Sequence, residues 1–195
     1  STEETRKYFP AHRKVQVTGY PLRPDLVQWN RTAARKALGL APDLPTLLVF
    51  GGSKGARSIN QALMKSLPEL LTKMQVIHLS GRLDWETVRA NADQLPSDLS
   101  ERYHLYAYLH DEMGAALAAA DLAVSRAGAS CLGEFPKFGL PAILVPYPYA
   151  WRYQRLNAAY LVQRGAAEML PDEDLQTKLL LSIMKLMEDP SRREA

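Results

Sequence analysis

The chain has 195 residues, of which 47% are hydrophobic and 23% are charged, a balance typical of a globular domain with its own core. Its 24 lysine and arginine residues exceed its 21 acidic residues by only three and form no long basic run, so composition argues against nucleic acid as a partner. The longest uncharged stretch, residues 138–151, holds three prolines and is too short for a membrane-spanning helix.

Cysteine and histidine usage excludes further classes of protein. Cys131 is the single cysteine, which rules out an internal disulfide and a cysteine metal cluster. His12, His78, His104 and His110 show no ligand spacing, so we expect no metal site and no cofactor. The first residues lack the apolar run of a signal peptide, and a reducing, cytoplasmic compartment fits best.

Short aliphatic or β-branched runs alternate along the chain with longer segments of helical period. The runs are residues 14–18, 46–50, 75–79, 104–108, 122–125 and 142–145. The helical patterns lie near residues 31–38, 56–71, 84–93, 112–120, 130–138, 153–164 and 173–188. Runs this short and apolar are typical of strands buried on both faces of a parallel sheet. We therefore predict an α/β fold, a Rossmann-like doubly wound parallel sheet of about six strands.

The two ends of the chain differ from this pattern. We expect residues 1–13 to be an exposed lead-in, residues 14–189 to form the folded domain and residues 190–195 to be a tail. A sheet of this size can be a whole small protein or one half of a larger one, and length alone leaves both open.

A glycine-rich turn, Gly51-Gly52-Ser53-Lys54-Gly55, follows the 46–50 run and opens a helix. Glycines allow the backbone to approach an anion closely, and the helix N-terminus offers free N–H groups. Ser53 can add a hydroxyl donor and Lys54 a full charge. The spacing is neither that of a P-loop nor G-x-G-x-x-G, so a tight turn without a ligand remains the alternative.

A second turn of small residues, 126–134, follows the 122–125 run. Two such turns in one sheet can cradle a diphosphate. Glu134 lies four residues after Ser130, on the same face of the predicted helix, where its two oxygens can accept both hydroxyls of a ribose. The alternative is a first-turn glutamate that favours the helix dipole. Because Pro136 lacks an N–H, this helix either begins near Glu134 or is kinked.

Residues 145–157 combine aromatic residues and prolines with the polar side chains of Gln154 and Asn157. This composition is typical of the rim of a small-ligand site, although a partner surface fits equally well. Cys131 stands near a helix N-terminus, but no histidine is placed to activate it, so we expect a buried apolar role.

Five segments, followed by a predicted helix that carries Gln154 and Asn157, together resemble one family closely. They are VTGYPLR (17–23), LLVFGGSKGARSIN (47–60), YLHDEM (108–113), ADLAVSRAGASCLGE (120–134) and FGLPAILVPYPYA (138–150). The chain resembles the carboxyl-terminal, donor-binding half of the family 28 glycosyltransferases from about Thr5 to Asp189. The resemblance implies one half of a GT-B fold and binding of UDP-N-acetylglucosamine. It further implies inverting, metal-independent transfer in the synthesis of a peptidoglycan lipid intermediate.

The resemblance also assigns roles to individual residues. Arg23 would lie near the nucleotide, Ser53 would meet the diphosphate, and the backbone of His110 would bind the uracil. Glu134 would accept the ribose hydroxyls, and Gln154 would hold the sugar. Contacts to the phosphates and sugar would come from Ala129, Ser130, Cys131, Leu132 and Gly133, with Gly52, Lys54 and Asn157 as further candidates.

The chain departs from the family pattern at a few positions. Lys54 stands where a glutamine is usual, Tyr20 replaces an asparagine and Cys131 replaces a threonine. Trp151 and Tyr153 replace the acidic residue and the histidine or glutamine that usually precede Gln154. These last two changes fall at the sugar end of the expected pocket.

The family's acceptor-side loops and candidate base belong to an amino-terminal half, of which only the last piece resembles a segment of this sequence, Thr5–Pro10. We therefore expect this chain to bind donor without transferring the sugar alone. The other half would be its partner, supplying a lipid-linked acceptor at the inner face of the cell membrane. Two alternatives remain, namely the donor subunit of a split dolichol-type transferase and a non-catalytic UDP-sugar-binding or protein-interaction module. A UDP-sugar 2-epimerase would need catalytic carboxylates and histidines that this sequence does not place.

Overall fold

The computed structural model describes residues 3–52, 56–149 and 153–189. One sheet runs through these residues, in the order β3-β2-β1-β4-β5-β6, and every strand pair is parallel. The strands are β1 (Thr46–Phe50), β2 (Gln75–Leu79), β3 (Tyr103–Tyr106), β4 (Leu122–Ser125), β5 (Ala142–Leu144) and β6 (Ala167–Met169). The predicted Rossmann-like α/β fold is confirmed.

The order of the strands reverses beside β1. The chain passes outward from β1 to β2 and β3, then returns to place β4 on the other side of β1, with Leu47 opposite Leu122. The loops that leave β1 and β4 therefore run in opposite directions and leave a crevice at the carboxyl edge of the sheet.

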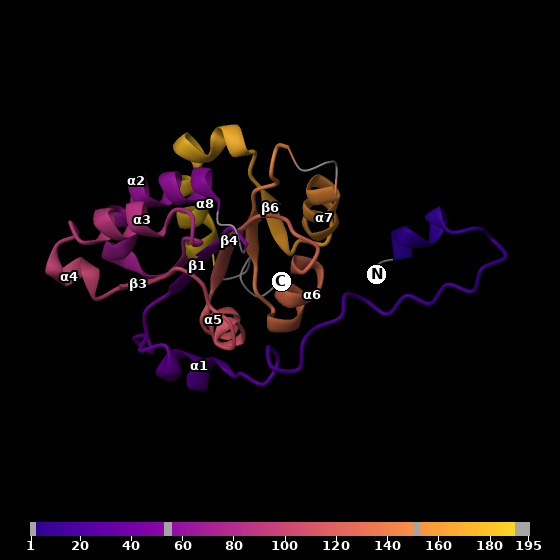
Figure 1. Ribbon diagram of the computed structural model, residues 1–195, viewed down its shortest axis with the longest axis horizontal. Coiled ribbons are helices and arrows are strands. Elements are labelled where there is room, and N and C mark those ends of the chain that lie inside the picture. Colours follow the sequence, from indigo (N-terminus) through magenta and orange to yellow (C-terminus); the bar gives the residue numbers. More distant parts are fainter. Residues whose placement is uncertain (1–2, 53–55, 150–152, 190–195) are drawn as a thin grey trace.

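Helices cover both faces of this sheet (Figure 1). One face packs against α1 (Arg31–Ala37), α5 (Met113–Ala119), α6 (Cys131–Phe138) and α7 (Tyr153–Val162). The other face packs against α2 (Arg57–Lys73) and α8 (Leu175–Glu188). The remaining helices are η1 (Glu3–Tyr8), α3 (Trp85–Ala92), α4 (Ser97–Ser100) and η2 (Asp172–Asp174).

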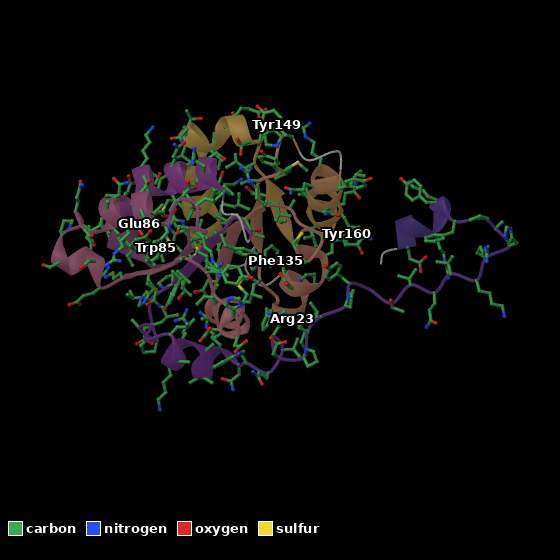
Figure 2. The ribbon with its side chains drawn as sticks, viewed as in Figure 1. Arg23, Trp85, Glu86, Phe135, Tyr149 and Tyr160 are labelled. Carbon is green, nitrogen blue, oxygen red and sulfur yellow. The ribbon has the colours of Figure 1, made fainter. Side chains whose placement is uncertain are left out.

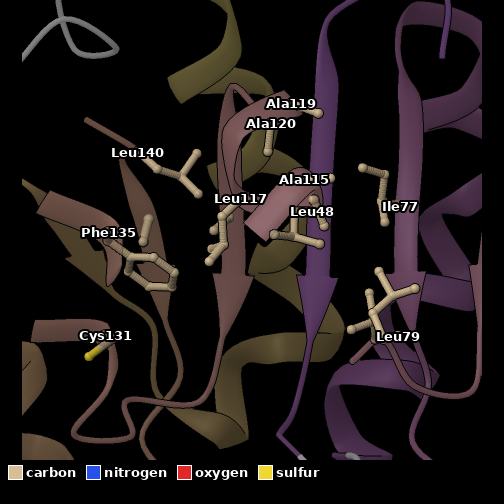
Figure 3. Packing of buried hydrophobic residues seen from close by; sticks show 14 of the residues in the cluster. Leu48, Ile77, Leu79, Ala115, Leu117, Ala119, Ala120, Cys131, Phe135 and Leu140 are labelled. Carbon is tan, nitrogen blue, oxygen red and sulfur yellow. The ribbon is translucent and has the colours of Figure 1, made fainter. Parts of the chain in front are cut away.

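Alternate residues of the central strand enter different cores. Leu47 and Val49 of β1 join the cluster under α2 and α8, whereas Leu48 joins the cluster under α5 and α6. Figure 3 shows Leu48 near Leu117 and Phe135 in that second cluster. A strand covered on both faces needs apolar side chains at every position, which is why the sequence runs show no polar alternation.

The prediction of a strand at residues 14–18 is wrong. These residues form no strand and run along an exposed segment that extends from the body of the molecule (Figure 1). Val15 and Val17 are only partly buried, and no neighbouring strand pairs with them within the described residues. Without a partner the backbone has no ladder of hydrogen bonds, so an alternating apolar pattern alone does not make a strand.

The sixth strand, β6, was missed because its sequence carries little strand signal. Ala167, Glu168 and Met169 are not β-branched, and the strand pairs only with β5, at the edge of the sheet. Its existence depends on the tertiary position of the chain after α7, a context that overrides local propensity.

Pro136 neither delays nor interrupts α6. The first turn forms with bonds of the 3₁₀ type, from Cys131 N to Gly128 O at 3.2 Å and from Leu132 N to Ala129 O at 3.2 Å. Glu134 N then donates to Ser130 O at 2.9 Å. Glu134 therefore lies one turn beyond Ser130 on the same face of the helix, as the spacing predicts.

A charged cluster pins the amino edge of the sheet, opposite the crevice. Asp121, just before β4, receives hydrogen bonds from the backbone N–H of Thr46 (2.8 Å) and from the Arg35 guanidinium (2.9 Å). Arg35 is 5% exposed and also donates to the carbonyl of Ala119. The cluster ties α1 and α5 to the first residues of β1 and β4.

Candidate functional site

Loops from four strands line one cavity of about 930 Å³ at the carboxyl edge of the sheet. Gly51 and Gly52 follow β1, Asp84 follows β2, Arg126 follows β4 and Tyr147 follows β5. The wall is completed by Phe50, Ala56, Arg57, Ser58, Gln61, Leu83, Ser125, Gly128, Ser130, Cys131, Glu134, Phe135, Pro148, Tyr149, Gln154 and Asp172. A cavity of this size and position is the usual ligand site of an open parallel sheet.

The structure brings five of the sequence-predicted residues together in this wall. They are Gly52, Ser130, Cys131, Glu134 and Gln154. They come from three separate segments of the chain, after β1, at the start of α6 and at the start of α7. The cavity thus joins both small-residue turns with the polar residue that follows the aromatic loop.

Glu134 is the carboxylate on the α6 side of the cavity. Burial raises the pKa of Glu134, and a hydrogen bond with the Ser130 side chain and the positive charge of Arg23 partly oppose this shift. A half-buried carboxylate with few donors nearby has acceptor capacity left for a ligand.

Cys131 lines the cavity but is not a reactive thiol. Its side chain is 3% exposed, and burial, reinforced by the charge of Glu134, raises the pKa of the Cys131 thiol to about 12. The thiol stays protonated at neutral pH and serves as a small apolar wall. This agrees with the apolar role expected from the sequence.

Arg23 and His110 lie outside the residues that line the cavity. Arg23 pairs with Asp25 at 3.5 Å, and its charge acts on Glu134. Figure 2 shows Arg23 and Phe135 near α6, away from Trp85 and Glu86 of α3. His110 is exposed in the loop after β3, with its ring in edge contact with Tyr108 at 4.5 Å between centroids.

Other predicted residues play supporting parts in the geometry. Asn157 donates from Nδ2 to the carbonyl of Ala127 at 3.0 Å, which holds α7 against the second turn. Gln154 accepts at Oε1 from the backbone N–H of Tyr147 at 2.8 Å. In the described chain, the Gln154 amide nitrogen keeps both hydrogens available for a ligand.

Three predicted residues belong to the second turn without lining the cavity. Ala129 is exposed, whereas Leu132 and Gly133 are partly buried in the first turn of α6. Ser53 and Lys54, together with Trp151, lie outside the described residues. Their predicted roles rest on the sequence.

An arginine that the sequence reasoning passed over anchors the cavity. Arg126 donates to Asp172 and, at 2.7 Å, to the hydroxyl of Ser58, and its guanidinium lies 5.3 Å from the centre of the Tyr147 ring. Its place directly after a predicted strand was the available signal. Asp172 offered none, because it lies 46 residues further along the chain.

Among residues 3–52, 56–149 and 153–189, no three His, Cys, Asp or Glu side chains gather in a way that can hold a metal ion. In the same residues, no helix has the length and apolar character needed to cross a bilayer.

The parallel sheet with its ligand cavity at the strand-order reversal is that of a Rossmann-like half of a GT-B glycosyltransferase. Residues 46–195 match the family described as glycosyltransferase family 28 C-terminal domain, and the chain belongs to this family. The crystal structure of MurG from Acinetobacter baumannii has a similar fold, with a TM-score of 0.69 at 26% identity over 94% of this chain and 50% of that one. The C-terminal CMP-Kdo binding domain of WaaA shares the fold alone, at 13% identity and a TM-score of 0.59.

Two of the most similar curated relatives carry the same name. A protein of Roseiflexus sp. (strain RS-1) is 49% identical over 93% of this chain and 46% of its own length. One of Chlorobium phaeobacteroides is 40% identical over 100% of this chain and 52% of its own length. Both are called UDP-N-acetylglucosamine–N-acetylmuramyl-(pentapeptide) pyrophosphoryl-undecaprenol N-acetylglucosamine transferase. The chain therefore spans about half the length of these relatives.

Proposed function

We propose that this chain is the donor-binding half of a transferase that moves N-acetylglucosamine from UDP to a lipid-linked peptidoglycan precursor. The observation that carries the proposal is the cavity in which Gly52, Ser130, Glu134 and Gln154 converge from three segments. The name shared by the relatives supports the identity of the sugar and of the acceptor. Residues 14–189 form the proposed UDP-sugar-binding domain.

In this proposal each part of the donor has its own group of residues. Glu134 accepts the ribose hydroxyls, aided by Arg23, and the loop of His110 receives the uracil. Gln154 donates from its free amide to the sugar. The diphosphate lies between the two small-residue turns, where the candidates are Gly52, Ser53, Lys54, Ala129, Ser130, Cys131, Leu132 and Gly133.

The proposed reaction is an inverting displacement without a metal ion. An acceptor hydroxyl attacks the anomeric carbon of the sugar, the bond from that carbon to the phosphate oxygen breaks, and UDP leaves with the electron pair. This chain stabilises the negative charge that develops on the diphosphate, by hydrogen bonds from fixed donors. A base in the amino-terminal half takes the proton, so the chain alone binds donor without transferring it.

The acceptor named in the relatives carries an undecaprenol chain. We propose that the whole protein meets it at the cytoplasmic face of the membrane, as a peripheral protein. The amino-terminal half would make this contact.

Calorimetric titration of the chain tests the proposal. We expect UDP-N-acetylglucosamine and UDP to bind and GDP not to bind. UDP-glucose tests the sugar end of the site, because Trp151 and Tyr153 depart from the family there. Equal binding of GDP, or no binding of any uridine ligand, would contradict the proposal.

A variant of Glu134 separates nucleotide binding from a protein-interaction role. We expect Glu134→Ala to weaken the binding of uridine at least tenfold, because a charge-assisted hydrogen bond contributes about 1.5–3 kcal/mol. A chain that used this face only for a protein partner would bind no uridine before or after the change.

A further inference from the structure

Among the described residues two arginines, Arg57 and Arg126, line the cavity, and they differ in how many of their guanidinium N–H groups already have hydrogen-bond partners. The side chain of Arg126 is only 10% exposed. Its two terminal nitrogens donate to Asp172, to the carbonyl of Val145 and to the hydroxyl of Ser58. Arg126 therefore holds the wall of the cavity together and has little left for a ligand.

Arg57, the first residue of α2, is arranged differently. Its side chain is 74% exposed, and its Nε donates to Asp84 Oδ1 at 3.1 Å. Within the described residues both terminal nitrogens of Arg57 are without a hydrogen-bond partner. The guanidinium is thus tethered at one edge while its outer edge remains open at the wall of the cavity.

The Asp84 carboxylate, which holds Arg57, is itself held in one orientation. The Asp84 side chain is 10% exposed, and its second oxygen accepts from Asn60 Nδ2 at 2.9 Å. The same nitrogen donates to the carbonyl of Ser80 at 2.9 Å, and Asn60 Oδ1 pairs with His78 Nε2 at 3.0 Å. A carboxylate held by a buried amide has one orientation, so it orients Arg57 in turn.

His78, at the far end of this chain of hydrogen bonds, is neutral. The Asn60 amide nitrogen donates both of its hydrogens, to Ser80 and Asp84. Asn60 Oδ1 can therefore only accept, so His78 Nε2 carries the proton and donates it to this oxygen. His78 Nδ1 then accepts from the hydroxyl of Tyr103 at 2.6 Å. Burial lowers the pKa of His78 to about 3, so the arrangement holds throughout the neutral range.

The free N–H donors of the described cavity wall, and not its net charge, favour Arg57 as an anion ligand. Arg126 pairs with Asp172, Arg57 pairs with Asp84, and Glu134 adds a negative charge, but only Arg57 keeps its terminal nitrogens free within the described residues. An anion entering this cavity therefore meets one guanidinium edge that is still free in the described wall. A planar guanidinium matches two phosphate oxygens at once, which a lysine cannot do.

We propose that Arg57 binds the diphosphate of the nucleotide sugar and that Asp84 is its positioning residue. This inference rests on the proposed function, because it names a residue that binds UDP, the group that leaves in the proposed reaction. Arg57 then stabilises the charge on the departing UDP, with no reorientation needed when the bond to the sugar breaks.

The test compares ligands with and without phosphate, by calorimetric titration of the 195-residue chain with UDP, uridine and inorganic pyrophosphate. We expect Arg57→Gln to weaken the binding of UDP and of pyrophosphate about tenfold or more and to leave the affinity for uridine unchanged. Arg57→Lys keeps the charge and recovers part of the loss. Asp84→Asn keeps Arg57 but loses its orientation, so the ratio of UDP to uridine affinity falls by a smaller factor.

Arg89→Gln is the matched control, because Arg89 is an exposed arginine of α3 that does not line the cavity. It is expected to change none of the three affinities. Unchanged UDP affinity in Arg57→Gln, or an equal fall for UDP and uridine, overturns the inference while the proposed function stands. A wild-type chain that binds neither uridine nor UDP overturns the proposed function itself.

Discussion

Gly133 of α6 lies directly against Tyr20, in the segment between η1 and α1. A methyl group at Gly133 would lie 3.0 Å from Tyr20 Cβ and 3.1 Å from both Tyr20 O and Leu22 Cδ2. Arg23 lies three residues after Tyr20, and Glu134 follows Gly133, so the contact sets the distance between this pair of interacting charges, of which Glu134 lines the cavity and Arg23 does not. Glycine is needed here for close approach and not for a positive φ.

Gly133→Ala tests this contact. The change removes the cost of a helical glycine, about 0.5–1 kcal/mol, but crowds Tyr20 and displaces Arg23 from Glu134. We expect the midpoint of urea unfolding to change little while uridine affinity falls several-fold. Adding Leu22→Ala to Gly133→Ala relieves one of the close contacts and should restore part of the affinity. Full affinity in the single variant would show that the contact does not position the charge pair.

The pH dependence of uridine binding is expected to follow Glu134. The ionised carboxylate accepts two hydroxyls, whereas the protonated acid offers one fewer acceptor site. Because the pKa of Glu134 is raised by burial, affinity should fall on acidification at a higher pH than for an ordinary glutamate. Uridine is the suitable ligand because it carries no phosphate that titrates in this range. Glu134→Gln should bind weakly, with no such pH dependence.

Arg23→Gln should move that transition. The positive charge of Arg23 lowers the pKa of Glu134, against the effect of burial. Without it the pKa of Glu134 rises further, so the loss of uridine affinity should begin at a higher pH than in the wild type. A pH profile measured by titration at fixed ionic strength checks this. An unmoved midpoint would mean that Arg23 does not act on Glu134.

The contribution of Glu134 to stability should depend on pH in the opposite sense to its contribution to uridine affinity. A carboxyl whose folded-state pKa is raised gives stability below its unfolded pKa and loses it as pH rises through the folded pKa. Glu134→Gln removes the buried charge, so it should unfold at a higher urea concentration than the wild type at pH 7. The difference should shrink on acidification. A variant that is less stable at pH 7 would contradict the assigned cause of the shift.

Gly114 of α5 is expected to be intolerant of any side chain. A methyl group there would lie 2.5 Å from the carbonyl oxygen of Leu26 and 2.8 Å from Trp29 Cδ1. The gain in helix propensity is about 1 kcal/mol, and overpacking against a backbone typically costs about 1–3 kcal/mol. We expect Gly114→Ala to lower the free energy of unfolding, as measured with urea. Ala118→Gly in the same helix should cost its helix propensity and the packing of one partly buried methyl group, with no overpacking.

Asp121→Ala separates stability from ligand binding. The change leaves the buried Arg35 without its carboxylate, which typically costs about 3–5 kcal/mol. Because Asp121 lies at the amino edge of the sheet, uridine affinity of the folded fraction should not change. Urea unfolding and calorimetry on the same sample check the two statements. A fall in uridine affinity would mean that the loss of Asp121 also perturbs the cavity at the carboxyl edge of the sheet.

The sequence predicted five of the six strands and the main helices, because runs buried on both faces leave a pattern that needs no neighbours to be read. The sequence-based prediction failed where the presence of a neighbouring strand decides whether a strand forms. Residues 14–18 have the pattern but no partner strand, and β6 has a partner but almost no pattern. Hydrogen bonding between strands is a property of position in the sheet, not of local composition.

For the site, spacing along one helix was enough to place Glu134 above Ser130, and two strand ends were enough to bring both turns to one edge of the sheet. The tertiary structure alone decided which arginine is engaged and which is open. Arg126 meets Asp172 across 46 residues, and Arg57 meets Asp84 across 27. Such contacts depend on how distant loops pack at the strand ends, and no local period in the sequence encodes them.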